Sequence, residues 1–409
     1  MLLRLAWRNL FRNRRRTALT VGAAAFATLL CLFNLAVSAG SQKRWIANAV
    51  ELYPGHFQVS QRGYRDTRSL DDALALSDAQ RAALGGLPAG THWAPRLEAF
   101  GLISPDVERA TGRGVAVFGV DVARESGASR LLGALHAGRA PEAPRELALG
   151  DVLARNLGVE IGGTVIFVSS DAFGSQAADR FRVTGTFHVG TDDLDGFGAI
   201  AGLADLQDFL QAGQGLSHVA VFAGDLHQLP KIDAALRAAF PAQQYEVLGW
   251  PELVPDLVQF IRMGDVGDWF QNGLLLIVVA FGLLNTVLMS VFERVREFGV
   301  LRALGMRPRA VFELVVLESL LLSLWGIALG FGLGIPGVLL LENHPFPITG
   351  PEMQASFAVF GIEPVIQLGF ARSELVALPL VLLGVGILAA VIPALRASRG
   401  RPVDALRAT

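Results

Sequence analysis

The chain has 409 residues, of which 52% are hydrophobic and 18% are charged, and its mean hydropathy is +0.44. This composition is typical of a protein partly surrounded by lipid and excludes a simple pair of soluble domains. The net charge of −2 says little, but arginines cluster at both ends and near residue 300, where they border apolar runs. Because nucleic-acid binding needs a basic face on a folded domain, no nucleic-acid partner is expected.

Residues 1–16 are predicted to form an amphipathic helix at the inner surface of the membrane. Trp7, Leu10 and Phe11 stand among arginines there, a pattern typical of helices that lie in the membrane interface. The alternative is a topology signal with no other role, and the two are compatible. A cleaved signal peptide is disfavoured, because the apolar run that follows is longer than the usual core of about 7–15 residues.

Four runs without Asp, Glu, Lys or Arg are long enough to cross a bilayer, which takes roughly 20 residues of helix. They are Thr17–Gln42, Trp269–Phe292, Ser319–Leu341 and Leu375–Leu395. With their flanks, these runs predict transmembrane helices at 17–42, 269–292, 310–341 and 374–396.

The arginines around these spans predict their direction. Residues 1–16 hold six arginines, 293–309 hold five and 396–407 hold four, whereas 342–371 hold no Lys or Arg. By the positive-inside rule, both termini, the 293–309 segment and the tail 397–409 are cytoplasmic. The 43–268 segment and the 342–373 loop then lie outside.

Residues 43–268 are predicted to form an extracytoplasmic α/β (α+β) domain inserted between the first and second transmembrane helices. Short β-prone runs alternate with helical patterns such as 151–158 and 230–240; the β-prone runs are 56–61, 114–121, 164–170, 180–190 and 217–225. Both edges of the domain have helical periodicity that runs into the neighbouring spans. We therefore expect a paired helical stalk there.

Few residues of this domain suggest chemistry. Its histidines are scattered without a His-Glu-x-x-His pattern, and the acidic run 191–196 lacks the glutamate that a calcium loop requires. No Gly-x-Ser-x-Gly elbow is present, and the single cysteine, Cys31, lies in an apolar run. The chain is therefore not expected to be an enzyme or to hold a metal or cofactor.

A nucleotide site is also missing from the sequence. The only lysines are Lys43 and Lys231, and neither ends a Gly-x-x-x-x-Gly-Lys phosphate loop. Ion-driven carriers usually place charged or broken-helix sites at mid-membrane, and these spans fit that pattern poorly. If the protein drives transport, the energy is expected to come from a second polypeptide.

The segment 293–309 is predicted to be a short helix between the second and third spans. Val295, Phe298, Leu301 and Leu304 recur at three-residue steps before a stop at Gly305 and Pro308. The charged residues Arg294, Arg296, Glu297 and Arg302 are then expected to face water, lipid headgroups or a partner. Two readings stay open, namely a hairpin lying on anionic lipid and a helix that fits a groove on another protein.

Glu318 is a candidate intramembrane carboxylate, because it lies about 12 Å beyond residue 310 along a helix. A carboxylate at such depth costs roughly 2.5 to 3.5 kcal/mol on insertion scales and needs a partner, a water-lined position or a proton. We expect it to face the helix bundle and to brace the hairpin, through an arginine of 294–302.

At this point the chain resembles the FtsX-like permease superfamily, the membrane subunits of ABC transporters that include MacB exporters and lipoprotein-releasing (Lol-type) permeases. The resemblance rests on "LAWRNLFRNRRRT", "ELALGDVLARNLGVEIGGTVIF", "FRVTGTFHVG", "NTVLMSVFERVREFGVLRALGMRPRAVFELVVLESLLL" and "PALRASRGRPVDALRA". It implies a permease subunit of the bacterial inner membrane without a fused ATPase.

The resemblance also implies that residues 293–309 are the coupling helix that docks on an ABC ATPase dimer. ATP and Mg would be bound by that partner, which would drive mechanotransmission into the outside domain. Carried over from the family, the coupling residues are Glu293, Arg294, Arg296, Glu297, Gly299, Leu301, Arg302, Leu304 and Gly305.

Similarity of residues 55–66 to the Lol-type branch implies release of lipoproteins, with a second permease copy or paralogue and a periplasmic lipoprotein carrier as partners. Candidate acyl-chain contacts are Phe26, Phe33, Phe281 and Leu284, which are otherwise ordinary lipid-facing or packing residues. The proline-rich run 342–351 departs from that branch. A MacB-like efflux component and an FtsX-like regulator of cell-wall hydrolases remain alternatives.

Overall fold

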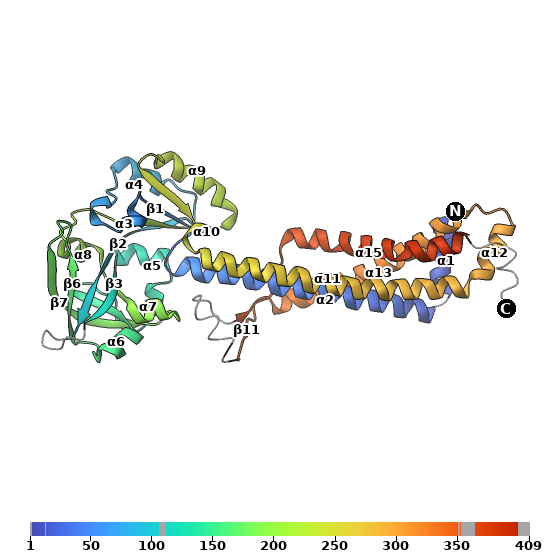
Figure 1. Cartoon of the computed structure of the whole chain (residues 1–409), viewed down its shortest axis with the longest axis horizontal. Coiled ribbons are helices and arrows are strands. Elements are labelled where there is room, and N and C mark those ends of the chain that lie inside the picture. The colour runs from blue at the N-terminus through green and yellow to red at the C-terminus, as the bar shows by residue number, and fades with distance from the viewer. Residues whose placement is uncertain (1, 13, 106–111, 351, 353–364, 400–409) are drawn as a thin grey trace. The chain divides into compact units, whose positions relative to one another are not determined.

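The computed structural model describes residues 2–12, 14–105, 112–350, 352 and 365–399 (Figure 1). It divides into two compact units. One comprises Met1–Arg44, Ile261–Pro347 and Val365–Thr409, and the other comprises Trp45–Phe260 and Ile348–Pro364. Most of the expected tail 397–409 and much of the expected loop 342–373 lie outside the described residues.

Four long apolar helices dominate the first unit. They are α2 (Arg14–Leu52), α11 (Pro255–Glu293), α13 (Pro308–Leu341) and α15 (Arg372–Arg399). Each is long and apolar enough to cross a membrane and contains one of the expected spans. At 39 residues, α2 and α11 are each roughly 58 Å long, about twice the thickness of a hydrocarbon core.

Two short helices and two short strands complete this unit as described. α1 (Leu2–Arg12) precedes α2, α12 (Val295–Ala303) separates α11 from α13, and β11 (Phe346–Pro347) pairs antiparallel with β12 (Val365–Ile366). The expected amphipathic helix at 1–16 is thus too long. Arginines 14–16 belong to α2, because arginine is a good helix former and continues the apolar helix that follows.

Small residues let α13 approach α2 closely. Gly326, Gly330 and Gly334 recur every four residues and so lie on one face of α13. A Cβ at Gly330 would lie 2.5 Å from Cβ of Thr28, and one at Gly334 would lie 2.6 Å from Cδ2 of Leu32. Because lipid tails are as apolar as the helices, such close van der Waals packing is the main source of helix association in a membrane.

Polar side chains join α2 to α11, which run side by side in Figure 1. Asn272 donates to Asn34 at 3.1 Å, and Gln42 donates to Asp265 at 2.7 Å. Ser38 also donates to Asp268. These contacts pair polar side chains of α2 directly with polar side chains of α11.

The second unit is a mixed α/β domain between the first and second long helices, as the sequence predicts. Its strands are β1 (Phe57–Gln61), β2 (His92–Ser104), β3 (Arg113–Val120), β4 (Leu135–Gly138), β5 (Glu146–Gly150), β6 (Thr164–Ser170), β7 (Gln176–Phe187), β8 (Gly198–Gly202), β9 (His218–Phe222) and β10 (Tyr245–Gly249). Its α-helices are α3 (Tyr64–Thr67), α4 (Asp78–Gly85), α5 (Val122–Ala128), α6 (Asp151–Leu157), α7 (Asp192–Phe197), α8 (Leu203–Phe209), α9 (Leu229–Ala239) and α10 (Trp250–Leu253).

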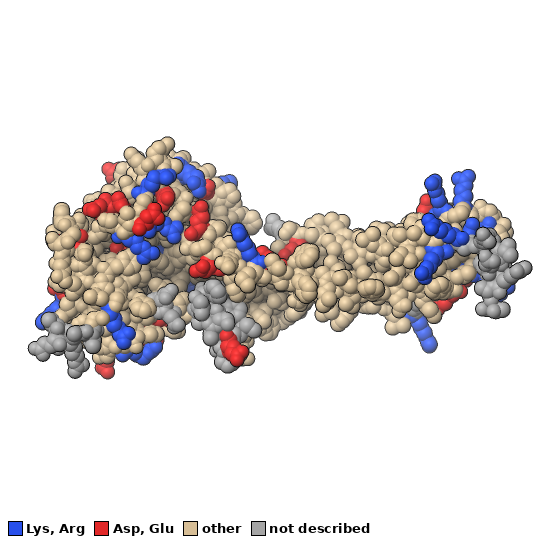
Figure 2. Space-filling view, viewed as in Figure 1, with Lys and Arg blue, Asp and Glu red and all other residues tan. Residues whose placement is uncertain are grey.

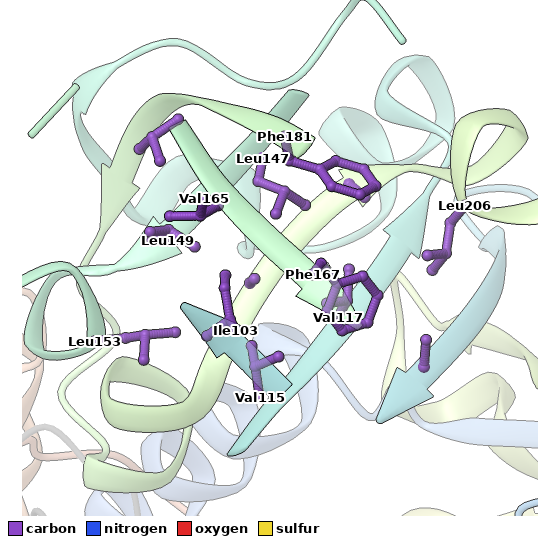
Figure 3. Close-up of a cluster of buried hydrophobic side chains, with 14 of the residues drawn as sticks. Ile103, Val115, Val117, Leu147, Leu149, Leu153, Val165, Phe167, Phe181 and Leu206 are labelled. Atoms are coloured by element: carbon purple, nitrogen blue, oxygen red, sulfur yellow. The ribbon is translucent and has the colours of Figure 1, made fainter. Parts of the chain in front are cut away.

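Six of these strands close into a ring. The hydrogen-bonded order runs β2, β3, β8, β5, β7, β6 and back to β2. Only the β3–β8 and β5–β7 pairs of this ring are parallel. Closure leaves no free edge among the six strands, and their inward side chains form one core that includes Phe167, Phe181 and Leu147 (Figure 3).

Strand β2 extends the sheet beyond the ring, because it is long enough to pair with both β9 and β6 along the edge opposite β3. Its first half pairs with β9, whereas residues 101–104 pair with β6. β9 continues to β1 and then β10, all antiparallel. Helices α4 and α9 contribute Leu84, Ile232 and Leu236 to the core beside these strands, where Val219 and Val221 are fully buried.

Candidate functional site

Basic side chains gather at one end of the helical unit. Figure 2 shows a long stretch of this unit without Lys or Arg, followed by blue side chains at the end where Figure 1 labels α1 and α12. In the sequence, arginines occur at several positions of 4–15 and 294–309, and α15 also ends in Arg396 and Arg399. The charged residues of the predicted coupling segment therefore share one end of the unit with the N-terminal helix.

Helix α12 ends in a fixed turn. Gly305 has φ +96°, its N–H donates to the carbonyl of Arg302 at 3.0 Å, and Met306 N–H donates to the carbonyl of Leu301 at 3.0 Å. These two bonds form a Schellman motif, which requires a left-handed residue that glycine supplies without strain. The turn directs the chain into α13, whose first residue is Pro308.

The predicted coupling residues differ in how much surface they offer. Glu293, Arg296, Leu304 and Gly305 are exposed, and Glu297, Leu301 and Arg302 are partly exposed. Arg294 and Gly299 are buried, so the expectation that Arg294 faces water or a partner is wrong. Arg294 turns inward because a buried carboxylate lies within its reach.

That carboxylate is Glu318, and its partner lies in the segment where the sequence placed it. Arg294 Nη1 donates to the two carboxylate oxygens at 3.0 and 2.8 Å. Arg294 Nε donates to Glu297 at 2.9 Å, and Asn9 Nδ2 of α1 donates to Glu318 Oε1 at 2.5 Å. The side chains of Arg294 and Glu318 are only 8% and 12% exposed. This largely buried carboxylate is tolerated because the bonds from Arg294 and Asn9 compensate its lost hydration.

The predicted hydrophobic face of α12 is only partly right. Phe298 is buried against Val291 and Val315, and Leu301 packs beside this cluster. Leu304, however, is 80% exposed, because α12 ends at Ala303 and the Schellman turn carries the chain away from the bundle. Leu304 is therefore outward apolar surface at the end of α12.

A small polar cavity adjoins Glu318. Its volume is about 30 Å³, enough for a water molecule. Hydroxyl groups dominate its polar lining, which comprises Asn9, Thr17, Thr20, Thr286, Ser290, Glu318 and Ser319. Apolar side chains, among them Phe298 and Leu322, complete the lining, so the carboxylate faces a mixed cavity that offers some hydroxyl groups.

An apolar groove lies elsewhere in the helical unit. It has a volume of about 530 Å³ and is lined mainly by hydrocarbon side chains, namely Leu30, Phe33, Val37, Leu275, Phe346, Ile366 and Leu368, with Asn34 and Gln271. Of the four predicted acyl-chain contacts, Phe33 lines this groove. Phe26 and Phe281 are 63% and 66% exposed, and Leu284 packs against the cluster of Ala24, Leu283 and Ala389.

In the domain, the fold brings together His188, Asp195 and Asp151, whose spacing in the sequence does not match a metal-binding motif. His188 Nδ1 lies 2.9 Å from Asp195 and 3.5 Å from Asp151. Asp195 is buried and accepts the backbone N–H groups of Val189 and Gly190 at 2.8 and 2.9 Å. These bonds account for the position of Asp195, so the group serves as a clamp on the 188–195 turn.

Comparison with known proteins gives one family match and several relatives. Residues 270–402 match the family model described as FtsX-like permease C-terminal. The matched range includes α12 and both Arg294 and Glu318, but not Asn9.

A relative of similar length is LolC of Xylella fastidiosa, named a lipoprotein-releasing system transmembrane protein. The two chains are 26% identical over 419 residues, which covers 99% of this chain and 96% of that protein. The macrolide export ATP-binding/permease protein MacB 2 of Aeromonas hydrophila is 34% identical over 131 residues, 32% of this chain and 18% of that protein. Among solved structures, the periplasmic region of MacB from Actinobacillus actinomycetemcomitans has a TM-score of 0.34 and 12% identity, covering 50% of this chain and 91% of that one.

Proposed function

We propose that this chain, a member of the FtsX-like superfamily of ABC transporter permeases, couples ATP hydrolysis by a separate ATPase subunit to movement of its α/β domain. The observation that carries the proposal is the arrangement of α12. Its outward residues offer a docking surface, whereas its inward residue Arg294 is bound to Glu318 of α13. A displacement of α12 would therefore be transmitted directly to α13.

In this proposal the end of the unit that carries α1 and α12 is cytoplasmic, in the inner membrane of a bacterium. The arginines at this end support that direction through the positive-inside rule. An ABC ATPase dimer binds ATP and Mg and grips α12. The mixed domain then lies on the opposite side, and both termini are cytoplasmic.

We propose release of lipoproteins as the transport function. Support comes from the similarity to LolC along almost the whole chain and from the apolar groove beside Phe33. The volume of about 530 Å³ lies within the range typical of sites for small ligands. An acyl chain needs such a hydrocarbon lining and no charged partner, which this groove provides.

A second permease copy or a paralogue is the partner proposed for α11. Only 17% of the most apolar 18-residue stretch of α11 is buried, compared with 44% for the corresponding stretch of α13. Phe270, Ile277 and Phe281 of α11 are exposed. A periplasmic lipoprotein carrier would receive the product. MacB-like efflux remains the alternative supported by the match to MacB 2, which is limited to 32% of this chain.

The proposal is tested by isolating the protein from its own membranes in detergent and identifying what accompanies it. Mass spectrometry of proteins and lipopeptides should find an ABC ATPase, a second permease and acylated peptides. An adaptor protein in place of lipopeptides would favour efflux, and a cell-wall hydrolase would favour regulation. Absence of any ATPase would contradict the coupling function itself.

The acyl-chain site needs its own variant. Phe33→Asp places a charge in the groove and should abolish co-purification of lipopeptides while the ATPase is retained. Leu19→Asp, on the same helix at a 76% exposed position outside the groove, is the matched control. Equal loss of lipopeptides in both variants would indicate a general defect of α2 and not a site at Phe33.

A further inference from the structure

Helix α1 is bound to the bundle more extensively than a helix that only lies on lipid. Ala6 and Leu10 are buried, and Ala6 belongs to a cluster with Val291 of α11 and Phe298 of α12. Trp7 lies with its ring centroid 6.1 Å from that of Trp325 on α13. Part of the apolar face of α1 therefore packs on protein.

Polar contacts from α1 reach both α12 and α13. Asn9 donates to Glu318 of α13, and Arg12 pairs with Glu297 of α12. Asn9 and Arg12 are three residues apart and so lie on the same face of α1. Arg294 joins the two acceptors, because it donates to both Glu297 and Glu318. The contacts form a closed circuit from Asn9 through Glu318, Arg294 and Glu297 to Arg12.

The circuit is balanced in charge and differs in burial along its length. Two arginines face two glutamates, and Asn9 adds a neutral donor. The Arg294–Glu318 side is buried, whereas Arg12 and Glu297 are 56% and 42% exposed. Exposed ion pairs contribute little, so Asn9 is the stronger of the two links from α1.

We propose that α1 is a working part of the coupling device and that Asn9 is its positioning residue. Asn9 fixes the carboxylate of Glu318 in the orientation that Arg294 requires, so that α1, α12 and α13 move as one body when α12 is displaced. Because opening the circuit would leave a buried charge without its partners, the three helices resist separate motion. This inference rests on the proposed coupling function.

The test uses the full permease with its co-purified ATPase in lipid nanodiscs. ATP hydrolysis and release of a synthetic triacylated lipopeptide are measured together, and the readout is lipopeptide released per ATP hydrolysed. Asn9→Asp places a second carboxylate against Glu318, since the two side chains are 2.5 Å apart. This variant should lower the ratio at least tenfold while the amount of bound ATPase is unchanged.

A second-site change separates positioning from general damage. Adding Glu318→Gln to Asn9→Asp removes the like-charge contact and restores a donor. The ratio of lipopeptide released per ATP hydrolysed should therefore be at least threefold higher in the double variant than in Asn9→Asp. Arg12→Gln should lower the ratio less than Asn9→Asp. Arg8→Gln, an exposed arginine of the same helix, is the control and should match the wild type.

The outcomes distinguish this inference from the function on which it rests. An unchanged ratio in Asn9→Asp, or a loss that only follows a loss of bound ATPase, would overturn the role of α1. Failure of Glu318→Gln to restore the ratio would also overturn it. A wild-type complex that hydrolyses ATP without any lipopeptide release would refute release of lipoproteins as the transport function, and this failure is seen in the wild type and not in Asn9→Asp.

Discussion

Arg96 and Glu125 form an ion pair in which both side chains are fully buried. Arg96 Nε donates to Glu125 Oε2 at 3.2 Å, and its guanidinium carbon lies 4.1 Å from the ring centroid of Tyr53. Arg96 also donates to the backbone carbonyl of Tyr53, the residue that follows the last residue of α2. A strand of the domain core thus holds the chain where it leaves the first long helix.

Removing this cation should destabilise the domain strongly. Arg96→Met leaves Glu125 as a buried charge without its partner, and such changes cost roughly 3 to 5 kcal/mol. Arg124→Met, in the exposed pair with Asp121, should cost less than about 1 kcal/mol and is the matched control. Hydrogen exchange of strand β2 in the intact protein measures both. Equal protection in the two variants would contradict a stabilising role for Arg96.

Two buried histidines should make the domain sensitive to acid. Burial lowers the pKa of His56 and of His218 to about 4, so both are neutral in the folded protein. His56 Nδ1 accepts the N–H of Ala223 at 3.1 Å, which only an unprotonated nitrogen can do. The pKa of each histidine is lower in the folded than in the unfolded protein, so protonation favours the unfolded state. The stability of the domain is therefore not reduced by these histidines above pH 6.5 and falls as the pH drops from 6.5 towards 4.

Each histidine contributes on the order of 3 kcal/mol to this dependence. His218→Phe should flatten the fall in stability between pH 6.5 and 4, because a phenyl ring can occupy the buried position without a proton to gain. His227→Phe, at an 82% exposed side chain, should leave the profile unchanged. Thermal unfolding across this range measures it, and an unaltered slope in His218→Phe would refute the assignment.

The long helices were predictable, because an apolar run long enough for a bilayer can hardly fold otherwise. The runs at 164–170 and 217–225 likewise contain β6 and β9, whose valines and aromatic residues favour strands. Strands β5 and β8 were not foreseen. Their sequences, ELALG and GAIAG, have weak strand propensity and become strands because the closed ring supplies hydrogen-bond partners on both sides.

At the candidate site, the sequence predicted Glu318 and an arginine of 294–302 as its partner, because a carboxylate at that depth in a membrane is costly. The sequence did not predict the contact of Asn9 with Glu318. Asn9 and Glu318 are separated by 309 positions, and a neutral amide among arginines carries no signal of its own in a single sequence. The exposed position of Leu304 was missed for a local reason, because three-residue spacing does not show where the Schellman turn ends the helix.

The glycine face of α13 should be sensitive to single methyl groups. Gly330→Ala places a Cβ 2.5 Å from Thr28 and 2.8 Å from the carbonyl oxygen of Ala25, so the helices must separate. Gly332→Ala meets nothing within 4 Å and adds a better helix former. We expect a lower melting temperature in detergent for Gly330→Ala only, because overpacking lowers stability by about 1 to 3 kcal/mol. Similar melting of both variants would argue against tight α2–α13 packing.

The last prediction separates the surface of α12 from its support. Leu304 is 80% exposed, whereas Phe298 is 3% exposed within the cluster that joins α1, α11 and α13. Leu304→Ala removes only outward apolar surface, so it should reduce capture of the ATPase severalfold without changing thermal stability. Phe298→Ala opens a cavity and should cost about 3 to 5 kcal/mol of stability in the isolated chain.

Because ATPase capture and thermal stability are measured on the same two preparations, each variant is the control for the other. Arg302→Glu adds a third case, since a reversed charge at the partly exposed end of α12 should lower coupling without affecting membrane insertion. If Leu304→Ala and Arg302→Glu both bind the ATPase as the wild type does, α12 is not the docking surface. The ionic circuit behind it would then serve only to hold the hairpin together.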